Sequence, residues 1–209
     1  MVRATADVGS QRRVTPRRNR DIEIVEAAVE VFSRKGFAAA SLQDVADRVG
    51  LLKGSLYHYI DSKEGMLFRI LQETHQQAEA IMAEVDQLNL PARERLLTYV
   101  ERIALWYLAN LDRAILYLSE WRYLEGDYAE TVRTQRRAFH AYMRDIVDEA
   151  YEAGQTRPDL DVRLATSFVI SAIGSIPTWY RAGRPENSLQ IAQEVARLSG
   201  STIFGVTPG

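Results

Sequence analysis

The sequence predicts an all-α protein, and three observations support this fold class. Apolar residues recur at intervals of three and four along most of the 209-residue chain, which is the spacing of one helix face. No stretch shows sustained alternation of apolar and polar residues with strand-forming side chains. Glycine and proline divide the chain into helix-sized pieces, as at Gly36, Gly50, Pro91, Gly126 and Gly154.

The first expected helix covers residues 19–35. Its apolar stripe consists of Ile22, Val25, Val29 and Phe32. Gly36 comes directly after it and suits the left-handed conformation in which many helices end. Residues 1–18 show no periodicity, and we expect them to form a disordered basic arm.

Residues 41–64 contain two short helical patterns separated by a glycine. Ser41 is a good N-cap for the first pattern, and Gly50 supplies the backbone freedom that a tight turn needs. The second pattern runs from Lys53 to about Tyr59, and Ser62 is the N-cap of the helix after it. Two short helices joined by such a turn form a helix-turn-helix motif, whose second helix enters the major groove of DNA.

A long helix over about 66–85 links this motif to the rest of the chain. His75 lies in its polar part, where we expect a solvated side chain. Further helices are expected at 91–110, 113–124, 127–153, 161–181 and 187–200. Pro177 should kink or end the helix that contains it. The sequence therefore predicts an N-terminal three-helix helix-turn-helix DNA-binding domain at 19–66 and a C-terminal helical-bundle domain at 67–204.

The pattern of residues 41–64 resembles the DNA-binding domain of the TetR family of repressors. The resemblance covers roughly residues 20–70 and rests on Ser41, Val45-Ala46, Gly50-Leu51, Leu56-Tyr57-His58-Tyr59 and Lys63-Glu64. It implies a homodimeric transcriptional repressor that binds a palindromic DNA operator, with ligand binding and dimerisation in the C-terminal domain. The residues that match DNA contacts of the family are Ser41, Gln43, Lys53, Gly54, Ser55, Tyr57, His58, Tyr59 and Lys63. For Leu56, Tyr59 and Ile60 a core role is the simpler interpretation.

The distribution of charge agrees with this resemblance. The net charge of −2 alone argues against a nucleic-acid-binding protein, but residues 1–65 hold 11 Lys and Arg against 9 Asp and Glu. The first 20 residues hold six Arg and one acidic residue. Either the arm is a solubilising tail, or Arg12, Arg13, Arg17 and Arg18 enter the minor groove, as N-terminal arms do.

The C-terminal domain is rich in Tyr and Trp, whose polar atoms need partners when they are buried. Such a set in a helical bundle is either ordinary core or the lining of a partly polar small-molecule cavity. We expect an effector cavity, lined by Trp106, Trp121, Phe139, Tyr142 and Trp179.

Residues 154–184 resemble the actinobacterial regulators of fatty-acid and steroid breakdown, through Arg157-Pro158-Asp159-Leu160-Asp161 and Trp179-Tyr180-Arg181. This resemblance implies a small hydrophobic effector such as an acyl-CoA thioester. Its phosphates would bind arginines among Arg102, Arg113, Arg122, Arg133, Arg136 and Arg137, unless these are surface or ion-pair residues. The alternative is a repressor of an efflux or detoxification gene that senses drug-like or aromatic ligands.

Two helices near the C-terminus predict the dimer interface. The first contributes Leu164, Ala165, Phe168, Ala172, Gly174 and Ser175, and the second Leu189, Ile191, Ala192, Val195 and Leu198. Together they can build a four-helix bundle across a two-fold axis. The alternative is that these faces pack inside one subunit.

The sequence also excludes several classes of protein. It contains no Cys, no run of about 18 apolar residues and no apolar segment behind its basic N-terminus, so we expect a cytoplasmic protein without a membrane-spanning helix. His58, His75 and His140 lie far apart, and no hydrolase, metalloprotease or phosphate-loop motif occurs. We therefore expect no enzyme activity, no cofactor and no metal site. A helical adaptor or an enzyme without DNA binding is the distant alternative.

Overall fold

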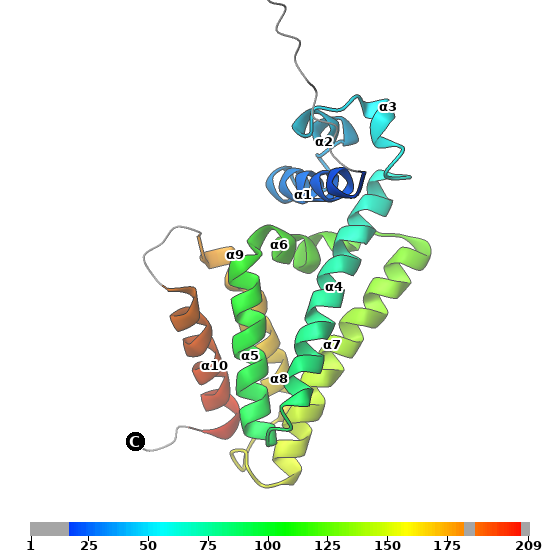
Figure 1. Cartoon of the computed structure of the whole chain (residues 1–209). Coiled ribbons are helices and arrows are strands. Elements are labelled where there is room, and N and C mark those ends of the chain that lie inside the picture. The colour runs from blue at the N-terminus through cyan, green and yellow to red at the C-terminus, as the bar shows by residue number, and fades with distance from the viewer. Residues whose placement is uncertain (1–16, 182–186, 206–209) are drawn as a thin grey trace, which may run out of the picture.

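A computed structural model describes residues 17–181 and 187–205 of the chain. Within these ranges every regular element is a helix, which confirms the all-α prediction. Figure 1 shows a small head of short helices at one end of a larger helical body. One long helix, α4 (Lys63–Gln87), begins in the head and continues through the body.

The head consists of α1 (Arg17–Lys35), α2 (Leu42–Arg48), α3 (Lys53–Leu56) and the first turns of α4. Ile24, Phe32, Val45, Leu56 and Leu67 are all fully buried in its core. Helix α1 begins at Arg17, within the arm predicted for residues 1–18, because nothing in the sequence from Arg17 to Asn19 breaks a helix. Arg12 and Arg13 of that arm lie outside the described residues.

The helix-turn-helix is fixed by its caps. The Ser41 hydroxyl accepts a hydrogen bond from the Asp44 amide at 3.2 Å, and the Asp44 carboxylate accepts one from the Ser41 amide at 2.8 Å. Gly50 has φ +66°, a conformation that favours glycine. Helix α2 therefore begins and ends where the sequence predicts.

Helix α3 is shorter than the sequence predicts. It ends at Leu56, and Tyr57–Tyr59 continue as a turn in which the Tyr59 amide donates to the Leu56 carbonyl at 2.9 Å. The reason is the next helix: Ser62 caps α4 by accepting a hydrogen bond from the Gly65 amide at 2.8 Å. The chain must change direction between Tyr57 and Ser62, which leaves one turn for α3.

The body contains the remaining helices. These are α5 (Ala92–Ala109), α6 (Leu111–Ser119), the 3-10 helix η1 (Glu120–Tyr123), α7 (Gly126–Glu152), α8 (Val162–Gly174), α9 (Ile176–Trp179) and α10 (Ser188–Phe204). The single helix expected at 161–181 is divided into α8 and α9, with Pro177 in the first turn of α9. None of the described helices combines the length and the apolar character that crossing a membrane requires.

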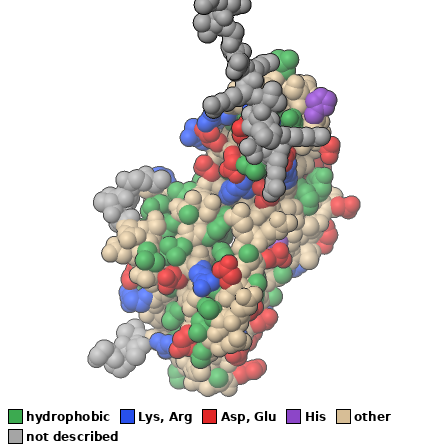
Figure 2. Space-filling view, in the orientation of Figure 1, with side chains coloured by type: hydrophobic (Ala, Val, Ile, Leu, Met, Phe, Trp, Pro, Cys, Tyr) green, Lys and Arg blue, Asp and Glu red, His purple; other side chains and the backbone are tan. Residues whose placement is uncertain are grey.

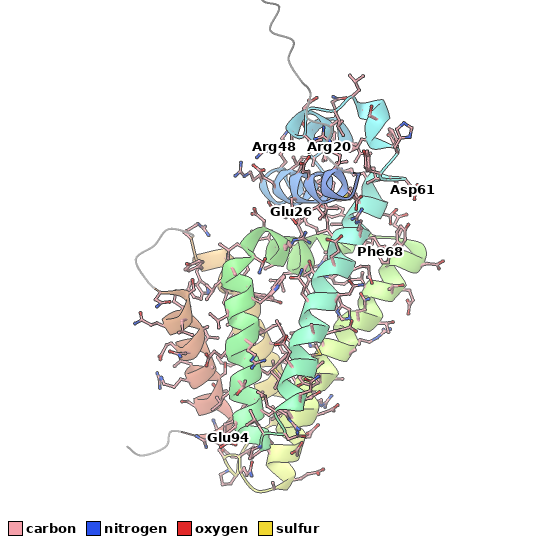
Figure 3. All side chains as sticks on the ribbon, viewed as in Figure 1. Arg20, Glu26, Arg48, Asp61, Phe68 and Glu94 are labelled. Carbon is pink, nitrogen blue, oxygen red and sulfur yellow. The ribbon has the colours of Figure 1, made fainter. Side chains whose placement is uncertain are left out.

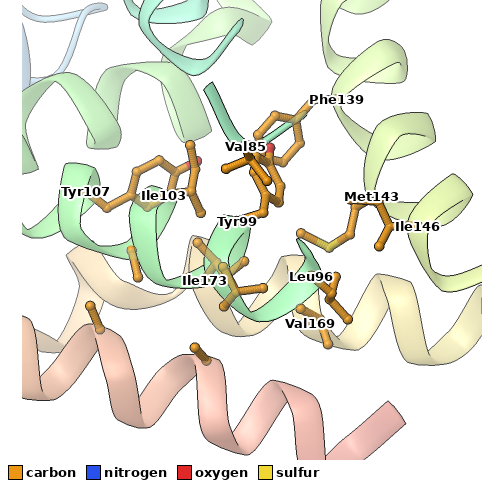
Figure 4. Packing of buried hydrophobic residues seen from close by; sticks show 14 of the residues in the cluster. Val85, Leu96, Tyr99, Ile103, Tyr107, Phe139, Met143, Ile146, Val169 and Ile173 are labelled. Carbon is orange, nitrogen blue, oxygen red and sulfur yellow. The ribbon is translucent and has the colours of Figure 1, made fainter. Parts of the chain in front are cut away.

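Two hydrophobic clusters hold the molecule together. Figure 4 shows the body cluster, where Tyr99 and Ile103 of α5 meet Phe139 and Met143 of α7 and Val169 of α8. The head cluster extends into the body through five buried residues, Leu116, Tyr117, Leu124, Ala129 and Val132. The head is therefore packed directly against α6 and the beginning of α7.

The helices predicted to dimerise have two apolar faces. Ala165 and Ala192 are buried in the body cluster, and Ile191 and Val195 pack partly against it, so these predicted interface residues lie mainly inside the chain. The opposite faces keep their apolar side chains in solvent. Leu164 and Phe168 on α8 and Leu189 and Leu198 on α10 are 43–61% exposed, and we call these four residues the apolar stripe.

Leu56 and Leu52 offer a matched pair of substitutions within the head. Leu56 is fully buried and Leu52 is 80% exposed. We predict that Leu56→Ala lowers the free energy of unfolding by about 2–5 kcal/mol, because it leaves a cavity in a small core. Leu52→Ala should change it by less than about 0.5 kcal/mol. Urea unfolding followed by circular dichroism measures both, and equal losses would contradict the packing described here.

Candidate nucleic-acid interface and effector cavity

The nine residues predicted to contact DNA lie in or beside α2, α3 and the start of α4, and none of them is buried. Figure 1 shows α2 and α3 at the end of the head away from the body. Ser41, Gln43, Lys53, Gly54, Tyr57 and His58 are exposed, and Ser55, Tyr59 and Lys63 are half-buried. Leu56 and Ile60 between them are buried in the head core. The helix-turn-helix therefore presents a polar surface on an apolar support.

Several of these side chains have partners within the head. Lys63 donates from Nζ to the Ala38 carbonyl at 3.3 Å and lies 4.3 Å from the centre of the Phe37 ring. Gln43 donates to the Asp47 carboxylate at 2.6 Å. Among the described residues Lys53 has no ion-pair partner, so its ammonium group is available to a ligand.

An ionic chain crosses the junction of head and body. Asp21 on α1 binds Arg69 on α4 at 2.6 Å, and Arg69 also binds Glu73 at 3.0 Å. Glu73 binds Arg113 on α6 at 3.3 Å, and Arg113 binds Glu26 on α1 at 2.5 Å. Figure 3 shows Glu26 on the side of α1 that faces α6. Arg113, which the sequence offered as a phosphate ligand, is thus a buried structural residue that joins three helices.

Two hydrogen bonds and a ring pair add to this junction. The Phe37 amide donates to the Glu120 carboxylate of η1 at 3.1 Å, and the Glu125 amide before α7 donates to Glu64 of α4 at 2.7 Å. Phe68 of α4, labelled in Figure 3, stacks on Tyr128 of α7 with ring centres 4.2 Å apart. A shift of α6 or α7 would therefore be transmitted to the head.

A cavity of about 650 Å³ opens between α7 and α8. Its lining consists of Trp121, Arg133, Arg136, Arg137, His140, Ala141, Arg144, Asp145, Arg163, Thr166, Ser167 and Ile170. Five arginines and one carboxylate make the lining basic, and three of these arginines have partners outside it: Glu130 pairs with Arg133 and Arg137, and Asp148 pairs with Arg144. Figure 2 shows acidic side chains along one edge of the body.

The cavity has an apolar neighbour and two unpaired polar atoms. A smaller pocket with Tyr107, Tyr117, Leu118, Phe139 and Ile173 in its lining shares Arg136, His140 and Ile170 with the main cavity. Trp121 Nε1 and Thr166 Oγ1 are buried without a hydrogen-bond partner among the described residues. A buried polar atom of this kind is costly unless a ligand or water satisfies it. The arrangement suits a ligand with an anionic part, a polar middle and an apolar end.

The structure brings together only part of the predicted effector cavity. Trp121 lines the main cavity and Phe139 lines its apolar neighbour. Trp106 instead donates to Gln77 at 2.7 Å, Tyr142 donates to Asp86 at 2.7 Å, and the half-exposed Trp179 donates to Ser175 at 3.2 Å. These three lie outside both pockets.

The basic lining of the cavity could have been predicted from the spacing of basic residues, although not from the number of aromatic residues. Arg133, Arg137, His140 and Arg144 follow each other at i, i+4, i+7 and i+11, which places them on one face of α7. A basic helix face beside an apolar one indicates an anion-binding surface. Arg133, Arg136 and Arg137 were candidates for this role, and Arg144 and Arg163 were missed.

The prediction of a solvated His75 is wrong. Its side chain is buried on α4 against α6, with Nδ1 3.4 Å from the Tyr117 hydroxyl and Nε2 3.2 Å from a Glu79 carboxylate oxygen. Burial lowers the pKa of His75, although Glu79 opposes this effect. Arg136 of the cavity donates to the Tyr117 carbonyl at 3.0 Å. We call this set, Arg136, Tyr117, His75 and Glu79, the polar relay; His75 and Tyr117 are buried, Arg136 is half-buried and Glu79 is exposed.

Two family models match the chain. Residues 24–70 match the model of bacterial regulatory proteins of the tetR family, and residues 89–202 match the model of the tetracyclin repressor-like C-terminal domain. These matches agree with a helix-turn-helix head on a helical body. The chain therefore belongs to the TetR family and is a DNA-binding transcriptional repressor of the helix-turn-helix type.

Individual relatives extend over nearly the whole chain. The repressor KstR2 of Mycobacterium tuberculosis H37Rv is 29% identical over 198 residues, which cover 88% of this chain and 94% of KstR2. The solved structure of that ketosteroid transcriptional regulator has a TM-score of 0.84 at 26% identity, covering 88% of this chain and 95% of the other. The repressor BdcR of Escherichia coli K12 is 34% identical over 189 residues, 90% of this chain and 91% of BdcR.

A further solved structure has the same fold at lower identity. AibR, in complex with isovaleryl coenzyme A and operator DNA, has a TM-score of 0.78 at 20% identity, covering 89% of this chain and 98% of AibR.

The lowered pKa of His75 predicts a dependence of stability on pH. The folded state resists protonation of His75, whereas the unfolded chain accepts a proton near its ordinary pKa of about 6.5. Stability is therefore present above that pH and is lost as the pH falls below it. His75→Gln should reduce the slope of unfolding free energy against pH between 7.5 and 5.5, by up to about 1.4 kcal/mol per pH unit.

Urea unfolding at several pH values measures this slope, which does not depend on any constant destabilisation by the substitution. His140, whose pKa is also lowered by burial and by Arg136, remains in the variant. His140→Gln is therefore the matched control, since it separates the contributions of the two histidines. An unaltered slope in His75→Gln would show that His75 is not buried in its neutral form.

Proposed function

We propose that this repressor is a homodimer that binds a palindromic operator through its two heads and is released by an anionic, amphipathic effector bound between α7 and α8. The observation that carries the proposal is the arginine-lined cavity with an apolar neighbour, connected to the head through α6 and α4. We assign the effector to the class of acyl-CoA thioesters.

The DNA-binding part of the proposal rests on the exposed surface of α2 and α3. Lys53 can bind a guanine or a phosphate, and the hydroxyls of Ser55 and Tyr57 suit phosphate oxygens. Gly54 lacks a side chain and lets the backbone approach the duplex. Lys63 is held by Ala38 and Phe37, so we assign it both to loop structure and to a phosphate at the start of α4.

The homodimer is supported by the apolar stripe of α8 and α10. Four large side chains exposed on two adjacent helices form a surface that a monomer would leave in contact with water. Pairing two such surfaces gives a four-helix interface across a two-fold axis. The axis would place two recognition helices about 34–36 Å apart, which is one turn of DNA.

The effector class follows from the chemistry of the cavity lining. Phosphate groups can form charge-assisted hydrogen bonds with Arg133, Arg137 and Arg163. The pocket beside Phe139 has a volume of about 30 Å³, so it would have to widen before an acyl chain could enter it. Arg133 and Arg137 pair with Glu130, and Arg144 pairs with Asp148. Arg136 and Arg163 have no acidic partner among the described residues, and a neutral drug-like or aromatic ligand would supply none, which disfavours that alternative. AibR, which shares the fold, was solved with a coenzyme A thioester.

The polar relay supplies a route from the cavity to DNA. Arg136 lines the cavity and holds the Tyr117 carbonyl of α6, and the Tyr117 hydroxyl reaches His75 of α4. An effector phosphate that binds Arg136 would weaken its hold on α6. Because Arg113 links α6 to α1, the head would then move relative to its partner head. A coupling free energy of about 1–3 kcal/mol is typical of such linkage.

The DNA surface is tested through the salt dependence of binding. We predict that Lys53→Ala weakens binding to a duplex selected from a random pool and lowers the slope of log K against log salt by about one unit. Fluorescence anisotropy at several salt concentrations measures this slope. Arg197→Ala on α10, an exposed arginine paired with Glu194, is the matched control and should leave the slope unaltered. If Lys53→Ala has the same salt slope as the wild type, Lys53 does not contact DNA.

The effector cavity is tested with coenzyme A thioesters of different acyl length, with free coenzyme A and with the free acids. We predict that Arg163→Ala weakens binding of the preferred thioester about tenfold or more, because a charged hydrogen bond contributes roughly 1.5–3 kcal/mol. Isothermal titration calorimetry measures this, and Arg197→Ala again serves as the control. Wild-type protein that ignores every thioester, or Arg163→Ala that binds normally, would contradict the assignment.

A further inference from the structure

Leu52 is the most exposed large hydrophobic side chain among the described residues, at 80%. It is the residue immediately before α3, between Leu51, which packs against the head core, and Lys53, which is exposed. Leu56, one turn further on, is fully buried. The chain therefore turns Leu51 and Leu56 inward and leaves Leu52 in solvent.

The fold gives no reason for a leucine at this position. Leu52 is the N-cap of α3, with φ −72° and ψ 143°, and its side chain makes no capping hydrogen bond. Ser, Thr, Asp or Asn at this position would cap the helix with a side-chain hydrogen bond and stabilise it. An exposed leucine thus replaces a stabilising residue by one with an apolar surface, which points to a contact outside the folded chain.

The chemistry of the major groove identifies that contact. Lys53, Gly54 and Tyr57 on the same surface are the residues that we assign to DNA, so Leu52 lies within the proposed interface. Base edges in the major groove offer hydrogen-bonding groups and one apolar group, the 5-methyl of thymine. We propose that Leu52 is a specificity-determining residue that recognises a thymine through this methyl group. This inference rests on the proposed DNA-binding function and adds a residue that reads sequence.

The test removes the methyl group from the DNA and the side chain from the protein. Wild-type protein first selects a duplex from a random pool, and each thymine of one half-site is then replaced singly by uracil, which differs only in the 5-methyl group. At one position we expect about fourfold weaker binding by the wild type, as burial of one carbon-sized apolar group predicts. Leu52→Ala should bind the thymine and uracil duplexes equally.

Two controls make the result specific. Leu88→Ala, an exposed leucine at the end of α4, should keep the full uracil effect. Circular dichroism and urea unfolding establish that Leu52→Ala is folded. In a second selection, Leu52→Ala should enrich duplexes without the thymine preference at that position.

The outcomes separate this inference from the function on which it rests. If the wild type selects a duplex but tolerates uracil at every position, the Leu52 inference is wrong and the DNA-binding proposal stands. If the uracil effect persists in Leu52→Ala, another residue reads the methyl group and the inference is wrong. If the wild type enriches no duplex, both proposals fail together.

Discussion

The ionic chain at the junction of head and body constrains the whole molecule. Arg113 is almost fully buried between α1, α4 and α6, and its charge is compensated by Glu26 and Glu73. The partners are more exposed, since the Glu26 side chain is 57% exposed and the Glu73 side chain is 33% exposed. Loss of either one would leave a mostly buried cation with a single carboxylate. Such a chain is a weak source of stability, but it strongly fixes geometry. It defines one position of the head relative to α6.

The interior of the body combines an apolar core with a few buried polar groups. Most of its core is aliphatic and aromatic, yet His75, Tyr117 and Thr166 place polar groups inside it. The Tyr99 hydroxyl is also buried without a hydrogen-bond partner among the described residues. The hydrogen bond between the buried side chains of His75 and Tyr117 is long, at 3.4 Å. In the proposed mechanism, a ligand would shift α6 by changing the partners of these polar groups, and the apolar core would stay intact.

The head was predictable from local chemistry, and the cavity was not. The caps at Ser41 and Ser62 and the turn at Gly50 depend only on residues a few positions away. These roles can therefore be predicted from the sequence. The aromatic residues expected in the cavity depend on which neighbours surround them. Trp106 donates to Gln77, which is 29 residues away in the sequence, and Tyr142 donates to Asp86, which is 56 residues away. No local sequence pattern predicts such pairs.

The sequence by itself determined the helices, their caps, the helix-turn-helix and the family, because each follows from interactions within a few residues or from a fixed spacing. Only the tertiary structure decided that α3 is one turn long, that His75 is buried and that five arginines converge on a cavity between α7 and α8. The physical reason is that burial and charge compensation depend on neighbours that chain folding supplies. For the same reason, Leu52 becomes informative only when Leu51 and Leu56 are seen to fill the core beside it.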